Sequence, residues 1–105
     1  NAFYQMVDSL SALIGQLALE ARLPTISNYD VHVRSGVLMS YGAKVEPQWR
    51  GAAGYIDRII KGEKPGVLPV QQPMLFDFVV NLKTQAALGI KFPIGMLASI
   101  TEVVE

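Results

Sequence analysis

The chemistry open to this sequence is limited by a single histidine, His32, among 105 residues. A Ser-His-Asp hydrolytic site would have to use this imidazole as its base, with Asp30 shortly before it and Ser40 shortly after it. No Gly-x-Ser-x-Gly turn surrounds Ser40, although α/β hydrolases present their nucleophile on such a turn. The pattern therefore argues against a nucleophilic triad, and we expect His32 to be a surface residue of a short helix.

Other common reaction centres are also missing from the sequence. Cysteine is absent, which excludes disulfides, thiol nucleophiles and Cys-ligated zinc. The acidic residues show no metal-site spacing, and there is neither a dinucleotide-binding glycine motif nor a P-loop. Nine basic and nine acidic residues give a net charge of zero, which argues against nucleic acid as a partner. The sequence therefore predicts a protein that is not an enzyme and that uses no cofactor and no metal.

A set of polar and aromatic residues remains at predicted junctions between strands and helices. In a parallel sheet such junctions collect along one edge, where they can converge on one ligand. A helix N-terminus there favours a carboxylate, and a tyrosine ring can stack on an apolar or aromatic ligand. The alternative is that each residue is an ordinary cap or turn residue, with Tyr41 in the core. The candidate ligand-binding residues are Asn1, Ala2, Phe3, Ser27, Asn28, Tyr29, Ser40 and Tyr41.

The elements that must position these residues alternate between helix and strand in the first half of the chain. Apolar residues at helical spacing predict a helix over 4–22, and 23–27 is expected to be a short strand. A helical turn over 30–35, capped by Asp30, leads into a short buried strand over 36–42. This rhythm predicts an α/β fold with a parallel sheet.

The middle of the chain has the pattern of a long amphipathic helix. Pro47 suits the first position of a helix that ends at Lys61, with Gly62 as its stop signal. Two prolines make 68–73 extended and incompatible with a central strand. We interpret this stretch as a crossing segment or a sheet edge.

The last third of the chain predicts a strand followed by two short helices. The run 75–80 is typical of a buried strand. Asn81 is expected to cap the next helix, which Gly89 closes, and Pro93 opens the last one. The final residues, 101–104, either continue that helix or form an edge strand.

Several stretches, taken in order, carry a resemblance to a known family. They are Leu-Pro-Thr-Ile at 23–26, Ser-Gly-Val-Leu-Met-Ser-Tyr-Gly at 35–42, the helix and turn at 52–65, Leu-Pro-Val-Gln-Gln-Pro at 68–73, Phe-Val-Val-Asn-Leu-Lys-Thr at 78–84, and Ala-Leu-Gly at 87–89. The series closely resembles the C-terminal part of ABC-transporter substrate-binding proteins whose better-known members bind aromatic amino acids. The similarity extends from about Leu17 to the end.

The resemblance implies a fold of the type I periplasmic-binding class, with two lobes joined by a hinge. The chain, 1–105, would be a C-terminal fragment and roughly the last third of that fold. Residues 1–39 and 76–105 would belong to the second lobe. Residues 40–75 would form crossing segments and a helix that packs on the first lobe.

The same resemblance implies a function in solute capture. The protein would bind a small ligand, with amino acids among the candidates, between its lobes and deliver it to an ABC permease in the membrane. It would be exported, and would be either periplasmic or lipid-anchored outside the cytoplasmic membrane. The alternative is a ligand-sensing regulatory α/β module that takes no part in transport. The chain departs from the family pattern at 28–33 and at Val37, which leaves the ligand open.

One physical consequence concerns the isolated chain. Without the first lobe, the helix near 47–61 would expose an apolar stripe that includes Trp49, Ile56 and Ile60. We therefore expect the isolated fragment to dimerise or to swap elements between copies.

Overall fold

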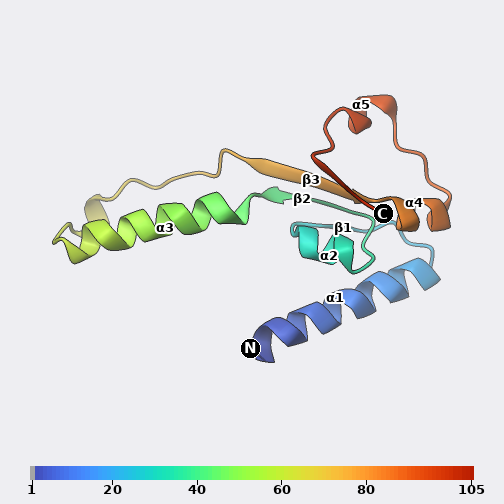
Figure 1. Ribbon diagram of the computed structural model, residues 1–105, viewed down its shortest axis with the longest axis horizontal. Helices are drawn as coiled ribbons and strands as arrows, with labels where there is room; N and C mark the ends of the chain where they lie inside the picture. Colours follow the sequence, from blue (N-terminus) through green and yellow to red (C-terminus); the bar gives the residue numbers. More distant parts are fainter. Residues whose placement is uncertain (1) are drawn as a thin grey trace. The chain divides into compact units, whose positions relative to one another are not determined.

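The structure is a computed structural model that describes the backbone of residues 2–105 and the side chains of residues 9–105. The chain divides into two compact units, one made of the residues up to Gly42 together with 77–105, and the other of 43–76. Figure 1 shows the elements in chain order. They are α1 (Ala2–Glu20), β1 (Ile26–Ser27), α2 (Asp30–Arg34), β2 (Met39–Ala43), α3 (Val45–Ile60), a 3₁₀ turn (Pro65–Val67), β3 (Phe76–Asn81), α4 (Leu82–Leu88), α5 (Ile94–Leu97) and β4 (Glu102–Val104).

The four described strands form one mostly parallel sheet in the order β1-β2-β3-β4. β1 pairs parallel with β2, and β3 pairs parallel with β4. The backbone N–H of Asn81 donates to the Leu38 carbonyl at 2.9 Å, next to the start of β2. The prediction of an α/β fold with a parallel sheet is confirmed, and the open choice at 101–104 is decided in favour of a strand.

The apolar core of the first unit is small and lies around β3 and the segment before β2. Its buried apolar residues are Val33, Val37, Leu38, Phe78, Val79 and Val80. Three consecutive members come from β3, which agrees with a strand that is covered on both faces. The core therefore fixes β3, and β3 supports the neighbouring β2.

Asn81 joins three elements at the end of β3. Its side chain accepts a hydrogen bond from the Thr84 N–H at 3.0 Å and donates one to the Val33 carbonyl at 2.9 Å. The Thr84 hydroxyl in turn donates to the Gly36 carbonyl at 2.9 Å. Asn81 is therefore the helix cap that the sequence predicts, and Gly89 ends α4 in the left-handed conformation, also as predicted.

Several predicted boundaries are wrong by a few residues. Asp30 does not cap α2, because Tyr29 occupies the N-cap position without a side-chain bond and Asp30 is the first helical residue. Pro47 is the third residue of α3, which begins at Val45, because a proline is tolerated throughout the first helical turn. The strand expected over 36–42 begins only at Met39, because Gly36 turns the chain with φ of +112°.

The contact face of α1 differs from its most apolar face. Leu10, Ile14 and Leu17 remain about half exposed in the described chain, whereas Ser11 and Gly15 are buried. A Cβ on Gly15 would lie only 2.8 Å from the carbonyl oxygen of Ser35. Helix α1 therefore approaches the turn after α2 through small residues, which allow the two backbones to come close.

The second unit consists of α3 and the extended segment that returns beside it. The Lys44 N–H donates to the Leu75 carbonyl at 2.9 Å, and the Tyr55 hydroxyl donates to the Pro69 carbonyl. At the far end of α3, Arg58 binds Glu63 through two hydrogen bonds of 2.5 and 2.6 Å. Hydrogen bonding between the two side chains raises the pKa of Arg58 and lowers the pKa of Glu63.

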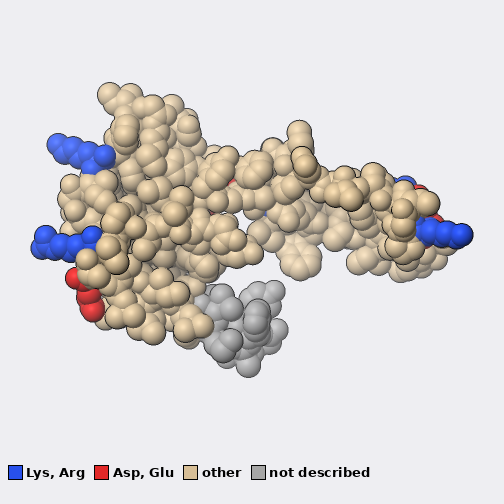
Figure 2. All heavy atoms as spheres, turned by 180° about the vertical axis from the view of Figure 1, so that it is seen from behind, with Lys and Arg blue, Asp and Glu red and all other residues tan. Residues whose placement is uncertain are grey.

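The charged side chains are few, at 17% of the residues. On the face in Figure 2, lysine, arginine and acidic side chains are scattered, and no large area of one sign is visible. None of the helices that the structure describes is both long and apolar enough to cross a membrane.

Candidate ligand-binding edge

The candidate residues of β1 and β2 meet at one edge of the sheet. In the parallel pairing of the two strands, Ser27 lies opposite Ser40. The turn after β1 then passes so close to β2 that a Cβ on Gly42 would overlap the carbonyl oxygen of Asn28. The structure thus brings 27–29 and 40–42 together, and their role as a ligand site stays a prediction.

The Ser27 hydroxyl is the centre of a small hydrogen-bond cluster at this edge. It accepts a bond from the Tyr29 N–H at 3.2 Å, and it is bonded to Nδ1 of His32. The Tyr29 and His32 rings meet edge to face, with centroids 5.7 Å apart and an interplanar angle of 86°. His32 lies on the short helix α2, as expected, and is partly exposed, with contacts to Ser27 and Tyr29.

Tyr41 is exposed at the same edge. Its side chain is 57% accessible, so the alternative that placed Tyr41 in the core is wrong. The ring packs edge to face against the buried Phe78, with centroids 6.2 Å apart and an interplanar angle of 74°. Because side chains alternate along a strand, the preceding Ser40 points to the opposite side and is buried, with 2% accessibility. Tyr41 is therefore supported by Phe78 while more than half of its surface stays accessible.

For three candidates the structure describes no side chain. Asn1 lies outside the described residues, and Ala2 and Phe3 are described only as backbone at the start of α1. Their contribution to a ligand site stays a prediction.

The geometry does not assemble a hydrolytic site from the candidate triad. Nδ1 of His32 is bonded to Ser27 rather than to Ser40, and the Asp30 carboxylate pairs with Arg34 at 3.8 Å. Among the described residues, no group of three or more histidine or acidic side chains is arranged to hold a metal ion.

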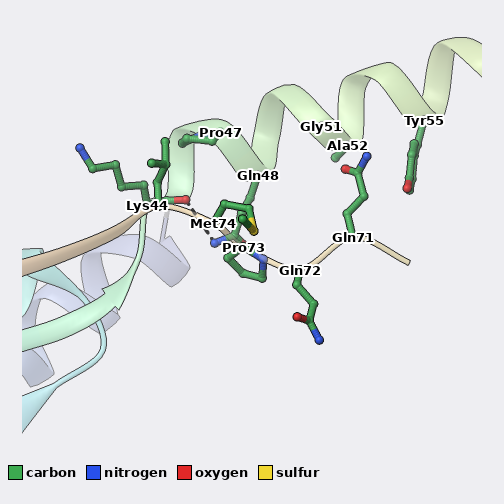
Figure 3. Close-up of a pocket in the computed structure, with 11 residues that line it drawn as sticks. Lys44, Pro47, Gln48, Gly51, Ala52, Tyr55, Gln71, Gln72, Pro73 and Met74 are labelled. Atoms are coloured by element: carbon green, nitrogen blue, oxygen red, sulfur yellow. Dashed lines mark hydrogen bonds between the residues drawn. The ribbon is translucent and has the colours of Figure 1, made fainter. Parts of the chain in front are cut away.

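The second unit contains a groove that the sequence reasoning missed. Figure 3 shows the groove between α3 and the extended segment before β3, with a volume of about 440 Å³. None of the five candidates whose side chains the structure describes lines it. The lining residues are Lys44, Pro47, Gln48, Gly51, Ala52, Tyr55, Gln71, Gln72, Pro73, Met74 and Leu75. The two prolines predicted an extended segment at 68–73, but no local pattern encodes its distance from α3. We call the extended segment 68–75 the strap.

Family membership is decided by a match over almost the whole chain. The model of the family described as "ABC transporter substrate binding protein" matches residues 3–104. The chain belongs to this family. The resemblance noted in the sequence is therefore confirmed.

Solved structures of similar proteins share the fold of this chain. A conserved domain protein from Vibrio cholerae is 28% identical, with a TM-score of 0.83 over 90% of this chain and 32% of its own. An ABC domain from Streptococcus pneumoniae, solved in complex with L-Trp, is 24% identical, with a TM-score of 0.74 over 83% of this chain and 30% of its own. None of the curated proteins matches the chain.

A third structure shows the same fold in another organism. It is the ligand-free, open form of a substrate binding protein with adhesive properties from Clostridium difficile, 24% identical, with a TM-score of 0.60 over 95% of this chain and 33% of its own. The chain spans about a third of the length of each of these three structures. The fold is accordingly an α/β fold of the periplasmic-binding type, and the predicted fold class is confirmed.

Proposed function

We propose that this chain is part of the solute-binding component of an ABC transporter, which captures a small ligand between two lobes and delivers it to a membrane permease. The observation that carries the proposal is the family match over residues 3–104. Binding alone is required, so the protein makes and breaks no covalent bond. Such a protein acts outside the cytoplasmic membrane, either in the periplasm or as a lipid-anchored protein.

The two compact units support a division of roles along the chain. Residues 1–39 and 76–105 are proposed to be second-lobe elements, and 40–75 to be crossing segments with a helix that covers the first lobe. The boundaries of the compact unit 43–76 lie close to those of the proposed crossing region. The extended, proline-containing strap agrees with a segment that links lobes rather than one that pairs within a sheet.

The ligand is proposed to bind at the edge formed by Ser27, Asn28, Tyr29, Ser40 and Tyr41. Tyr29 and Tyr41 are 49% and 57% accessible, so both rings have apolar surface available for a ligand. The Ser27 hydroxyl and the Asn28 amide can bind the carboxylate and ammonium groups of an amino acid, whereas the buried Ser40 contributes through its position in β2 opposite Ser27. The L-Trp complex of the Streptococcus pneumoniae domain makes aromatic amino acids the first ligand class to test.

The deciding experiment is thermal unfolding of the full-length protein with a panel of amino acids that includes tryptophan, tyrosine and phenylalanine. A ligand present at 100 times its Kd stabilises the folded state by about 2.7 kcal/mol, which raises the melting temperature measurably. We expect a shift with at least one aromatic amino acid. No shift across the panel would exclude these ligands and require other small solutes.

Two single-residue variants test whether Tyr41 belongs to the ligand site. Tyr41→Ala removes an exposed ring and should abolish most of the shift, whereas Ile94→Ala, on the exposed part of α5, should leave the shift unchanged. Equal shifts in both variants would remove Tyr41 from the site.

An uptake assay distinguishes a role in transport from a role in ligand sensing. Cells that lack the gene should lose import of the ligand, and import should return with the wild-type gene. Normal import in cells without the gene would favour a regulatory module that senses the ligand.

The isolated 105 residues are proposed to dimerise or to swap elements through α3. Trp49, Ile56 and Ile60 are 67%, 58% and 79% accessible, so the helix presents an apolar stripe. Light scattering at micromolar concentration should give the mass of a dimer, and a Trp49→Glu/Ile56→Glu variant should be monomeric. A wild-type monomer would contradict this proposal.

A further inference from the structure

His32 contacts two of the proposed ligand-binding residues, Ser27 and Tyr29. Its Nδ1 atom is bonded to the Ser27 hydroxyl, and its ring meets the Tyr29 ring edge to face at 5.7 Å between centroids. The Tyr29 N–H closes the cluster by donating to Ser27 at 3.2 Å. One side chain thus restrains both the hydroxyl and the aromatic ring.

The Ser27 hydroxyl has one proton to donate and two lone pairs that can accept. The Tyr29 N–H occupies one lone pair. If Nδ1 of His32 carries no proton, Ser27 must donate to it and keeps one lone pair for a ligand. If Nδ1 carries the proton, His32 occupies the second lone pair and Ser27 keeps its own proton for a ligand. The position of the imidazole proton therefore decides whether Ser27 presents an acceptor or a donor to the ligand.

We propose that His32 is a positioning residue of the ligand site, which fixes the hydrogen-bond polarity of Ser27 and the orientation of the Tyr29 ring without touching the ligand itself. The proposal rests on the ligand-binding role proposed above for this edge. It also accounts for a histidine at a partly buried position in a chain where this is the only one.

Two matched variants of the full-length protein test the proposal by calorimetric titration with L-tryptophan. Asparagine places its amide near the position of Nδ1, whereas glutamine carries it one bond further, toward the position of Nε2. Both variants lose the ring that meets Tyr29, so only the hydrogen bond to Ser27 distinguishes them. We expect His32→Gln to bind roughly three- to tenfold more weakly than His32→Asn, the loss that follows from one misplaced hydrogen bond. Equal affinities for the two variants would overturn the proposal.

A spectroscopic measurement tests the role of His32 without any ligand. Long-range ¹H–¹⁵N spectra report the protonation of each imidazole nitrogen, and the signals lost in His32→Asn identify those of His32. We expect Ser27→Ala to shift the Nδ1 signal of His32, and both His32 variants to shift the Tyr29 ring signals, because each removes the imidazole that meets this ring edge to face. If L-tryptophan fails to bind wild type, the proposed ligand class is wrong, while these spectra still decide the role of His32. An Nδ1 signal that ignores Ser27→Ala would refute that role.

Discussion

Ser27 and Ser40 lie directly opposite each other in the parallel pair β1–β2. β1 ends at this pair while β2 continues to Ala43, so the turn after Ser27 passes beside the last residues of β2. A slip of one residue would turn every β1 side chain to the other face. The candidate edge therefore depends on how closely the turn at Asn28 can approach Gly42.

Gly42→Ala should damage this edge. The added Cβ would overlap the Asn28 carbonyl oxygen and lie 3.0 Å from its carbon, and both are backbone atoms that cannot rotate away. We expect a loss of about 1–3 kcal/mol of unfolding free energy, as for other overpacked sites, together with weaker ligand binding. Urea unfolding measures the first effect and calorimetric titration the second.

Gly54→Ala is the matched control for this substitution. Gly54 is an exposed residue inside α3, and a Cβ there meets no atom within 4 Å. The same change should stabilise the protein by about 0.5–1 kcal/mol, because alanine loses less backbone entropy in a helix. A Gly42→Ala protein as stable as wild type would show that the turn at Asn28 is free to move.

Asn81→Ala should be among the more destabilising single changes in the first unit. It removes the cap of α4 and the donor to the buried Val33 carbonyl at 2.9 Å. Together these losses should cost about 2–3 kcal/mol.

Asn81→Ser separates the two contributions. Serine retains a cap oxygen for the Thr84 N–H but is too short to reach the Val33 carbonyl. We expect an intermediate free energy of unfolding in urea titrations. If serine proved as destabilising as alanine, the cap would contribute nothing.

Local patterns explain how much of this architecture could be predicted from the sequence. The cap at Asn81, the helix end at Gly89 and the buried run of β3 depend on neighbouring residues, so the pattern is sufficient. The start of β2 was predicted too early because Val37 and Leu38 are buried before the strand begins. Burial alone does not distinguish a strand from a packed turn.

Other features depend on partners far along the chain, which no local pattern encodes. Gly15 approaches the Ser35 carbonyl, so α1 packs through small residues while its leucines stay exposed. The bond between His32 and Ser27 arises because a five-residue helix turns the imidazole back toward β1. The groove in the second unit depends on the position of the whole strap.

Tyr55→Phe should loosen the strap that forms this groove. The change removes only the hydroxyl that donates to the Pro69 carbonyl, so the ring can keep its contacts. Because Tyr55 is partly exposed, the free energy of unfolding should fall by no more than about 0.5–1 kcal/mol. Amide hydrogen exchange should become faster at Val70, Gln71 and Gln72.

The control for this change is Val70→Ala. Val70 is on the same strap, and its side chain is 96% accessible, so its truncation should leave exchange unchanged. Equal exchange in wild type and Tyr55→Phe would mean that the hydroxyl does not hold the strap.

Glu63→Gln should reduce stability at neutral pH in a manner that disappears in acid. The hydrogen bond from Arg58 lowers the pKa of Glu63 below its ordinary value of 4.5, so folding favours the ionised carboxylate. The resulting stabilisation is fully present above that ordinary value and is lost as the pH falls through the lowered pKa of the folded state. Arg58 stays charged throughout this range, because its pKa is raised from an already high value.

Urea unfolding of wild type and Glu63→Gln, from about pH 7 to about pH 2.5, measures this dependence. The midpoints should differ at neutral pH and converge in acid, and added salt should narrow the gap because both groups face solvent. Glu46→Gln is the control, since the Glu46 carboxylate lies 2.6 Å from Arg50 across one turn on the more exposed surface of the same helix. Glu46→Gln should lower the unfolding midpoint less than Glu63→Gln does, because an exposed ion pair one helical turn apart contributes little stability. A gap for Glu63→Gln that stays constant through the acid range would show that the carboxylate charge does not stabilise the end of α3.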